Sequence, residues 1–281
     1  MSTEPAAGGG APCALFVSPH LDDVAFSCGA LASGLGDAGW RTVLATVFTR
    51  SVVPAEGFAL ACQLDKGLGA EVDYMALRRD EDRAAARVLG FAECLHLDLP
   101  EAPHRGYGSA AELFAGVREG DEVWAAVAEM LGGLAARVAP SLVLAPQGLG
   151  GHADHRQVVR AVREAVRAPV WWYRDTPYAI RHGDGAAPEE MAGLGGVAVA
   201  AGGGMARKVS AACAYASQLG FQFGGAEGAA AALHGFARDE AGRAEAAGEL
   251  PRGSAGGGAA ERFLCAAGDR AAANGVMRGA A

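Results

Sequence analysis

The sequence predicts an α/β protein in which a mostly parallel β-sheet is flanked by helices. Continuous apolar runs at 13–17, 42–48 and 141–145 are typical of strands that are covered on both faces. Segments with apolar residues at helical spacing lie between these runs. Strands that alternate with helices form parallel sheets through crossover connections. The expected architecture is therefore a Rossmann-like three-layer fold.

Local signals place the individual elements. Asp22 or Asp23 can cap the first helix, and Gly36 and Gly90 follow the apolar patterns of the first two helices. An acidic first turn marks the second helix. The predicted strands span 13–17, 42–48, 95–99, 141–145 and 170–173, and the predicted helices span 22–35, 80–89, 121–138, 157–166 and 208–219.

One domain is expected over residues 13–281, preceded by a disordered tail at 1–12. The 281 residues, of which 51% are hydrophobic, suffice for one large core. The pattern of helices and strands weakens after residue 180, and the glycine-rich stretch 248–258 predicts a mobile loop. Six cysteines without a C-x-x-C pair fit neither a thiolate zinc site nor a disulfide framework.

Composition excludes several classes of partner. The formal net charge is -8, and no cluster of Lys and Arg is present that could bind a polyanion, so nucleic acid is not expected as a partner. No apolar run approaches the roughly 20 residues of a membrane span, and the first residues do not resemble a secretory signal. We expect a cytoplasmic protein that acts on a small molecule away from membranes. The sequence does not indicate an oligomeric state.

Two polar clusters follow predicted strands, at the edge of the sheet where such folds bind ligands. The stretch S-P-H-L-D-D at 18–23 brings His20, Asp22 and Asp23, and H-A-D-H at 152–155 brings His155. Two histidines and one carboxylate form a common zinc ligand set that leaves a position for water. His20, Asp23 and His155 are the predicted ligands of one zinc ion, although iron(II) suits the same set.

The remaining polar residues of the two clusters have predicted catalytic roles. If 21–22 forms the turn into a helix, His20 and Asp23 converge on the ion and Asp22 is left to act as general base. Asp154 lies close enough in sequence to fix the tautomer of His152 and to favour its charged form, which could stabilise an oxyanion or protonate a leaving amine. For each cluster taken alone, a helix cap or a solvated turn explains the residues equally well.

Further substrate contacts are predicted from position only. Glu101 and Arg105 follow the strand at 95–99, and Asp175 and Tyr178 follow the strand at 170–173. Residues at such strand ends line ligand sites in α/β sheets. Solvated loops are an alternative interpretation of the segment that holds Glu101 and Arg105.

The strand followed by P-H-L-D-D, together with the later G-x-G-G-H-x-D-H, resembles the zinc-dependent N-deacetylases of the PIG-L or LmbE-like superfamily. The resemblance extends over most of 13–220 and implies the same ligands and base, with His152 as the acid or electrophile. It also implies that Arg78, in the R-x-x-E stretch at 78–81, contacts substrate. The usual first motif is H-P-D-D-E, so Leu21 and Val24 depart from it outside the ligand positions.

The resemblance implies a zinc hydrolase that removes the acetyl group from an N-acetylated amino sugar, in antibiotic or thiol biosynthesis. One alternative is a deacylase or amidase that acts on a non-sugar natural-product intermediate. Another is a non-catalytic member that only binds metal. Some members have a tyrosine two residues before the histidine of the second motif as an oxyanion donor. This chain has Gly150 there, so the donor must come from elsewhere or be absent.

Overall fold

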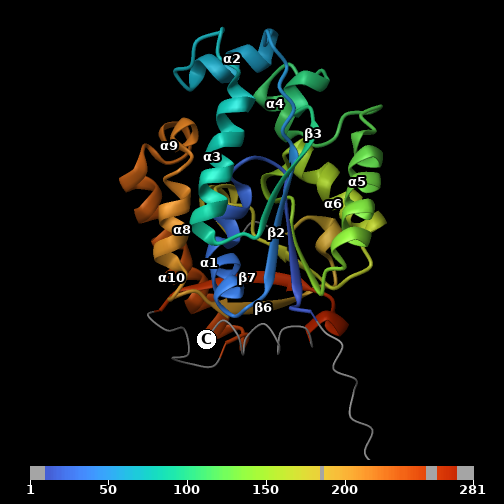
Figure 1. Cartoon of the computed structure of the whole chain (residues 1–281). Helices are drawn as coiled ribbons and strands as arrows, with labels where there is room; N and C mark the ends of the chain where they lie inside the picture. The colour runs from blue at the N-terminus through green and yellow to red at the C-terminus, as the bar shows by residue number, and fades with distance from the viewer. Residues whose placement is uncertain (1–9, 184–186, 251–257, 271–281) are drawn as a thin grey trace, which may run out of the picture.

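A computed structural model describes residues 10–183, 187–250 and 258–270 of the chain. It contains a seven-stranded sheet in the order β3-β2-β1-β4-β5-β7-β6 (Figure 1). The first five strands in this order are parallel, and β7 is antiparallel to both of its neighbours. The strands are β1 (Cys13–Ser18), β2 (Arg41–Phe48), β3 (Glu93–Leu99), β4 (Leu142–Pro146), β5 (Val170–Tyr173), β6 (Gly195–Ala200) and β7 (Ala260–Cys265).

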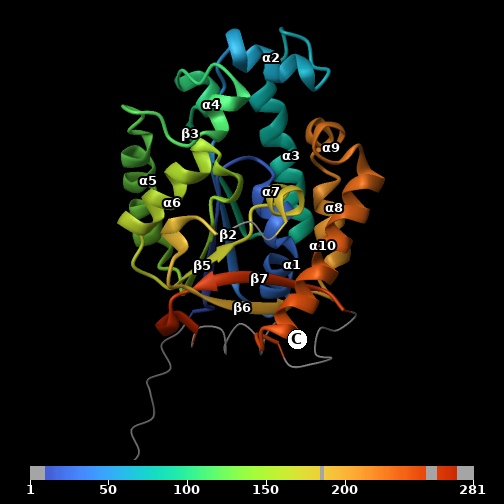
Figure 2. The ribbon, with the colours of Figure 1, turned by 180° about the vertical axis from the view of Figure 1, so that it is seen from behind.

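Helices cover both faces of the sheet, which confirms the predicted α/β fold. Among the described residues these are α1 (Asp23–Asp37), α2 (Gly57–Asp65), α3 (Tyr74–Leu89), α4 (Ala110–Phe114), α5 (Val123–Val138), α6 (Ala153–Ala165), α7 (Tyr178–His182), α8 (Met205–Ala212), α9 (Ala216–Phe223) and α10 (Ala226–Ala246). Figures 1 and 2 show α5 and α6 on one side of the central strands and α1, α3 and α8 on the other.

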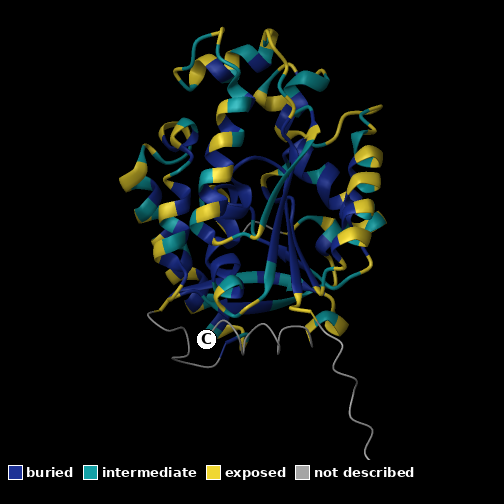
Figure 3. Ribbon diagram, viewed as in Figure 1, coloured by how far each residue is buried: buried dark blue, intermediate teal, exposed yellow. Residues whose placement is uncertain are grey.

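Alternate residues of β1 build the two halves of the core. Leu15 and Val17 pack with Val127 and Leu131 of α5 on one face of the sheet. Phe16 packs on the other face against α1, which presents apolar side chains including Leu31. Successive residues of a strand point to opposite faces, so a strand that is buried on both sides must be apolar throughout. Figure 3 shows the central strands as the most deeply buried part of the protein.

The strand order places a ligand site at the end of β1. From β1 the chain crosses to β2 on one side, and it later enters β4 on the other side of β1. Strand order therefore reverses between β1 and β4, and the crossover segments diverge beyond the carboxyl ends of these two strands. Both polar clusters of the sequence lie at this point.

Several elements differ from the sequence-based expectation. Helix α3 begins at Tyr74 instead of residue 80, because the Asp73 carboxylate caps it by accepting a bond from the Ala76 N–H at 2.9 Å. The helix predicted at 208–219 is two helices, α8 and α9, interrupted at 213–215. Helix α6 begins at Ala153 instead of residue 157. This earlier start puts His155 in the first helical turn.

The C-terminal part contains elements that the sequence signals missed. Helix α10 is rich in alanine and strand β6 begins with two glycines, so neither shows the apolar periodicity used for prediction. The tail predicted at 1–12 falls largely outside the described residues, as does most of the loop predicted at 248–258. Within the described residues, no helix combines the length and the apolar character that crossing a membrane requires.

Candidate active site

A closed turn after β1 positions the first cluster. The Asp22 N–H donates to the His20 carbonyl at 3.0 Å, and the Ser18 hydroxyl donates to the same oxygen at 2.6 Å. Asp23 is the first residue of α1, and its carboxylate accepts a hydrogen bond from the His20 N–H at 2.7 Å. This arrangement confirms the turn predicted at 21–22, and it holds the His20 and Asp23 side chains on one side.

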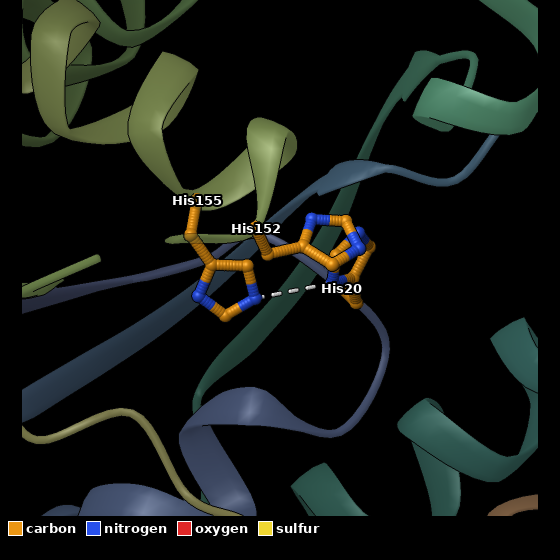
Figure 4. Close-up of side chains that lie close together, drawn as sticks. All are labelled: His20, His152 and His155. Atoms are coloured by element: carbon orange, nitrogen blue, oxygen red, sulfur yellow. Dashed lines mark hydrogen bonds between the residues drawn. The ribbon is translucent and has the colours of Figure 1, made fainter. Parts of the chain in front are cut away.

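Three buried side chains from both clusters meet at one point. The Nε2 atom of His155 lies 3.3 Å from Nδ1 of His20 (Figure 4), and the Oδ2 atom of Asp23 lies 3.4 Å from each of these nitrogens. Tetrahedral zinc has bonds of about 2.0–2.1 Å, which separate its ligand atoms by about 3.3–3.4 Å. The three atoms thus have the spacing of one face of such a tetrahedron. This donor set fits a metal ion.

His152 offers a second possible ligand set. Donor atoms of His20, His152 and His155 lie within 4.8 Å of one another, and all three rings are buried (Figure 4). The three measured separations within the triangle that includes Asp23 match those expected around one ion. Helix α6 also engages His152, because its Nδ1 atom accepts the Asp154 N–H at 3.2 Å as a helix cap. We therefore treat His20, Asp23 and His155 as the candidate ligands.

Each candidate histidine ligand is oriented by a carboxylate from a different strand end. Nε2 of His20 lies 2.9 Å from Oδ2 of Asp154, and Nδ1 of His155 lies 2.5 Å from Oδ1 of Asp175. Such partners fix the ring so that its other nitrogen faces the metal, and they raise its basicity. Asp154 and Asp175 are both fully buried.

These contacts correct three sequence-based assignments. The Asp154 carboxylate holds His20 instead of His152, since only its backbone N–H reaches His152. Asp175 was predicted to contact substrate, but its oxygens are occupied by His155 and by the N–H groups of Gly148 and Leu149. Arg105, also predicted to contact substrate, lies 2.8 Å from the Asp154 carboxylate and holds it in place.

Burial acts against the charged form predicted for His152. Burial lowers the pKa of His152 well below its usual range, and the neighbouring His20 lowers it further. The ring is therefore neutral at pH 7. Because Nδ1 accepts a backbone N–H, the proton of the neutral ring resides on Nε2. His152 can act as a neutral hydrogen-bond donor.

Asp22 lies beside the triangle without belonging to it. Its Oδ1 atom lies 3.7 Å from Nη2 of Arg78, and Nη1 of Arg78 bonds to Oε1 of Glu101 at 2.6 Å. Burial raises the pKa of the Asp22 carboxyl to about 6, although the Arg78 guanidinium acts in the opposite direction. A carboxylate with a pKa near working pH is suited to general base catalysis.

A cavity of about 410 Å³ opens above these residues. Its lining includes His20, Asp22, Asp23, His152 and Asp154, together with the predicted contact residues Arg78, Glu101 and Tyr178. Arg105 and Asp175 do not line it. Most of the remaining wall is apolar and includes Phe58, Leu113, Phe114, Pro177 and Phe221. The cavity therefore combines polar residues of both clusters with a largely apolar wall.

Comparison with known proteins assigns the family. The PIG-L family model, described as GlcNAc-PI de-N-acetylase, matches residues 15–166, which is more than half of the chain and includes both clusters. The chain belongs to the PIG-L family. This confirms the resemblance noted in the two sequence motifs.

Relatives of this PIG-L protein include characterised deacetylases. The 2'-N-acetylparomamine deacetylase of Streptomyces fradiae is 41% identical over 168 residues, which cover 59% of this chain and 57% of that protein. The match thus spans little more than half of the length of that relative. A deacetylase of the A40926 pseudoaglycone has a TM-score of 0.74 and 27% identity, over 90% of this chain and 96% of its own. A deacetylase from the teicoplanin pathway has a TM-score of 0.75 and 25% identity, over 90% and 97%.

Gly150 marks where this PIG-L chain lacks the tyrosine that some members have. Its φ is +80°, and a Cβ atom there would lie 2.9 Å from Cγ of Tyr178. The Tyr178 ring therefore fills the space beside Gly150, packs edge-on to His155 with centroids 5.4 Å apart, and lines the cavity. The side chain of Tyr178, which follows β5, thus occupies the space that a side chain at position 150 would enter.

Sequence reasoning missed most of the apolar wall of the cavity. Phe58 comes from α2, Phe114 from α4 and Phe221 from α9, whereas Tyr74 and Gln218 contribute polar atoms. Helices α2 and α4 are short and lack a strong apolar period, so no pattern placed them near the site. The position of Asp175 after a strand did indicate that it lies near the site. That position does not tell whether its carboxylate orients a metal ligand or contacts substrate.

Proposed function

We propose that this protein is a zinc-dependent hydrolase that removes the acetyl group from an N-acetylated amino sugar, a small-molecule intermediate of antibiotic or thiol biosynthesis. Membership of the PIG-L family supports the reaction class. The S. fradiae relative, named as a 2'-N-acetylparomamine deacetylase, supports the substrate class. The observation that carries the proposal is the triangle of His20, Asp23 and His155, together with Asp22, which lies outside the triangle and lines the cavity.

Zinc is proposed because two imidazoles and one carboxylate at tetrahedral spacing are typical of its catalytic sites, and iron(II) is the alternative ion. When bound, the ion would supply Lewis acidity toward the amide carbonyl and toward water. His20, Asp23 and His155 would hold it, and Asp154 and Asp175 would keep both rings in the ligating tautomer.

Asp22 is the proposed general base. Its carboxylate lines the same cavity as His20 and Asp23, and Asp22 directly precedes Asp23 in the chain. Arg78 keeps one Asp22 oxygen within 3.7 Å and is itself bound by Glu101. We propose that Asp22 removes a proton from the attacking water and passes it to the departing amine.

His152 is the proposed electrophile. Its Nε2–H, the proton-bearing atom of the neutral ring, belongs to a side chain that lines the cavity. A donor placed where negative charge develops on the carbonyl oxygen stabilises the transition state. A neutral donor performs this role without adding a further positive charge near the metal.

The test is a screen of N-acetylated amino sugars for freed amine, run with metal-replete protein. Acetate and amine should appear in equal amounts, and both should be absent after chelation and return when zinc is restored. Chemically matched N-propionyl and N-butanoyl sugars serve as the control for acyl selectivity. Stable metal binding without release of amine from any of these sugars would contradict the proposed deacetylation of amino sugars.

The apolar residues of the cavity wall favour one second candidate function. Phe58, Phe114 and Phe221 could contact a longer acyl chain or an aromatic scaffold that an unsubstituted sugar does not have. A deacylase that acts on a non-sugar natural-product intermediate would use the same polar residues. Faster hydrolysis of long-chain amides than of acetamides would identify this function. A cytoplasmic location stays a prediction under either candidate.

A further inference from the structure

A second group of potential ligands lies away from the candidate active site and shares no residue with it. Asp82 on α3 faces Cys94 and His96 on β3. Cys94 and His96 are two residues apart on one strand, so their side chains project from the same face of the sheet. Strand β3 lies at the margin of the sheet and pairs only with β2 among the described strands.

The three donor atoms converge. Sγ of Cys94 lies 3.7 Å from Oδ2 of Asp82 and 3.8 Å from Nε2 of His96, and the last two atoms are 3.0 Å apart. Around tetrahedral zinc, with bonds of about 2.3 Å to sulfur and about 2.0–2.1 Å to nitrogen or oxygen, sulfur lies about 3.5 Å from the lighter ligands. The separation of two lighter ligands is about 3.3–3.4 Å. The three donor atoms therefore need to move by only a few tenths of an ångström to reach the separations found around tetrahedral zinc.

The surroundings hold the group in this geometry. Asp82 is almost completely buried, and its Oδ1 atom accepts the Tyr215 hydroxyl at 2.7 Å. The Thr46 hydroxyl donates to Oδ2 at 2.9 Å. The His96 side chain is 10% exposed, so part of it contacts solvent. Rigid support from neighbouring hydrogen bonds is what functional metal sites require.

We propose that Asp82, Cys94 and His96 form a second metal site, which takes zinc or another divalent ion with affinity for thiolate. The Cys94 thiol releases its proton to solvent when the S–metal bond forms, and His96 binds through its neutral ring. The thiolate and the Asp82 carboxylate then balance the 2+ charge. The ion links β3 to α3, and solvent completes its coordination. The site does not depend on the proposed reaction.

Cobalt(II) substitution tests the proposal, because thiolate ligands give cobalt an intense charge-transfer absorption in the near ultraviolet. The candidate active-site ligands His20, Asp23 and His155 offer only nitrogen and oxygen donors, so this absorption reports a site that contains a cysteine. Metal-stripped protein titrated with cobalt should bind two equivalents and develop the thiolate absorption. One equivalent per chain, or two equivalents without that absorption, would overturn the proposal.

Variants assign the signal to its residues. Cys94→Ser should bind one equivalent of cobalt and lose the absorption, and His96→Gln should do the same. Cys213→Ser, at an exposed cysteine, is the matched control and should resemble the unmodified protein. His155→Ala should lose one equivalent while it keeps the thiolate absorption. An absorption that survives in Cys94→Ser would contradict the assignment.

X-ray absorption of the zinc-loaded, unmodified protein gives a test that needs no variant. At two equivalents of zinc it should detect a sulfur neighbour at about 2.3 Å in addition to nitrogen and oxygen neighbours. A spectrum without sulfur would show that Asp82, Cys94 and His96 form only a hydrogen-bonded network.

Discussion

The ends of β1 and β4 contribute to the same site in different ways. At β1 the backbone turn is held locally, since the Asp23 carboxylate accepts the backbone N–H of His20 only three positions away. The imidazole rings at both ends are held by remote residues: Asp154 after β4 binds the His20 ring, and Asp175 after β5 binds the His155 ring. Each candidate histidine ligand is thus oriented by a carboxylate from another strand end. The comparison shows that a sequence motif reveals the candidate metal ligands. It does not reveal the carboxylates that orient them.

His155→Ala tests whether the β4 end supplies a ligand, and it has the largest expected effect. Loss of one corner of the triangle should remove the active-site metal and reduce turnover to the uncatalysed background. Metal analysis and amine release measure the two effects. His234→Ala, at an exposed histidine of α10, is the control and should change neither. Retention of the active-site metal in His155→Ala would show that the triangle is not the binding site.

Asp22→Asn tests the division of labour within the β1 end. The substitution keeps shape and removes the proton acceptor, so kcat should fall by about 10²–10⁴-fold. Active-site metal content should stay unchanged, because Asp22 is not one of the candidate ligands. Asp23→Asn provides the contrast and should lower metal content. Equal metal loss in both variants would contradict separate roles for the adjacent carboxylates.

Asp154→Asn tests whether the Asp154 carboxylate orients the His20 ring. Loss of the orienting carboxylate should weaken active-site metal binding by about 10–100-fold, and excess metal should restore much of the activity. Isothermal titration with zinc measures the affinity, with Asp239→Asn on the exposed face of α10 as the control. If Asp154 served His152 instead, as its sequence position indicates, kcat would fall while the affinity for metal stayed constant.

Gly150→Ala has the smallest expected effect. An alanine at φ +80° costs about 1–2 kcal/mol, and its Cβ would push against the Tyr178 ring. We expect thermal unfolding at a lower temperature together with a raised KM. Gly133→Ala is the matched control, since Gly133 lies on the exposed face of α5 with nothing within 4 Å of an added Cβ. It should stabilise the protein by about 0.5–1 kcal/mol. A stable Gly150→Ala protein with unchanged KM would argue against the importance of the Tyr178 position.

The sequence by itself determined the parallel core of the sheet, because a strand buried on both faces must be continuously apolar and leaves a clear local signal. The sequence also indicated the candidate site residues His20, Asp22, Asp23 and His155, since these residues closely follow their strands in the chain. Tertiary structure alone decided which carboxylate holds which histidine, that Tyr178 fills the space beside Gly150, and that α2, α4 and α9 form the cavity wall. The same holds for the antiparallel margin formed by β6 and β7. These relations join residues far apart in sequence, and the chain carries no periodic signal for contacts that form only when separate strand ends are brought together.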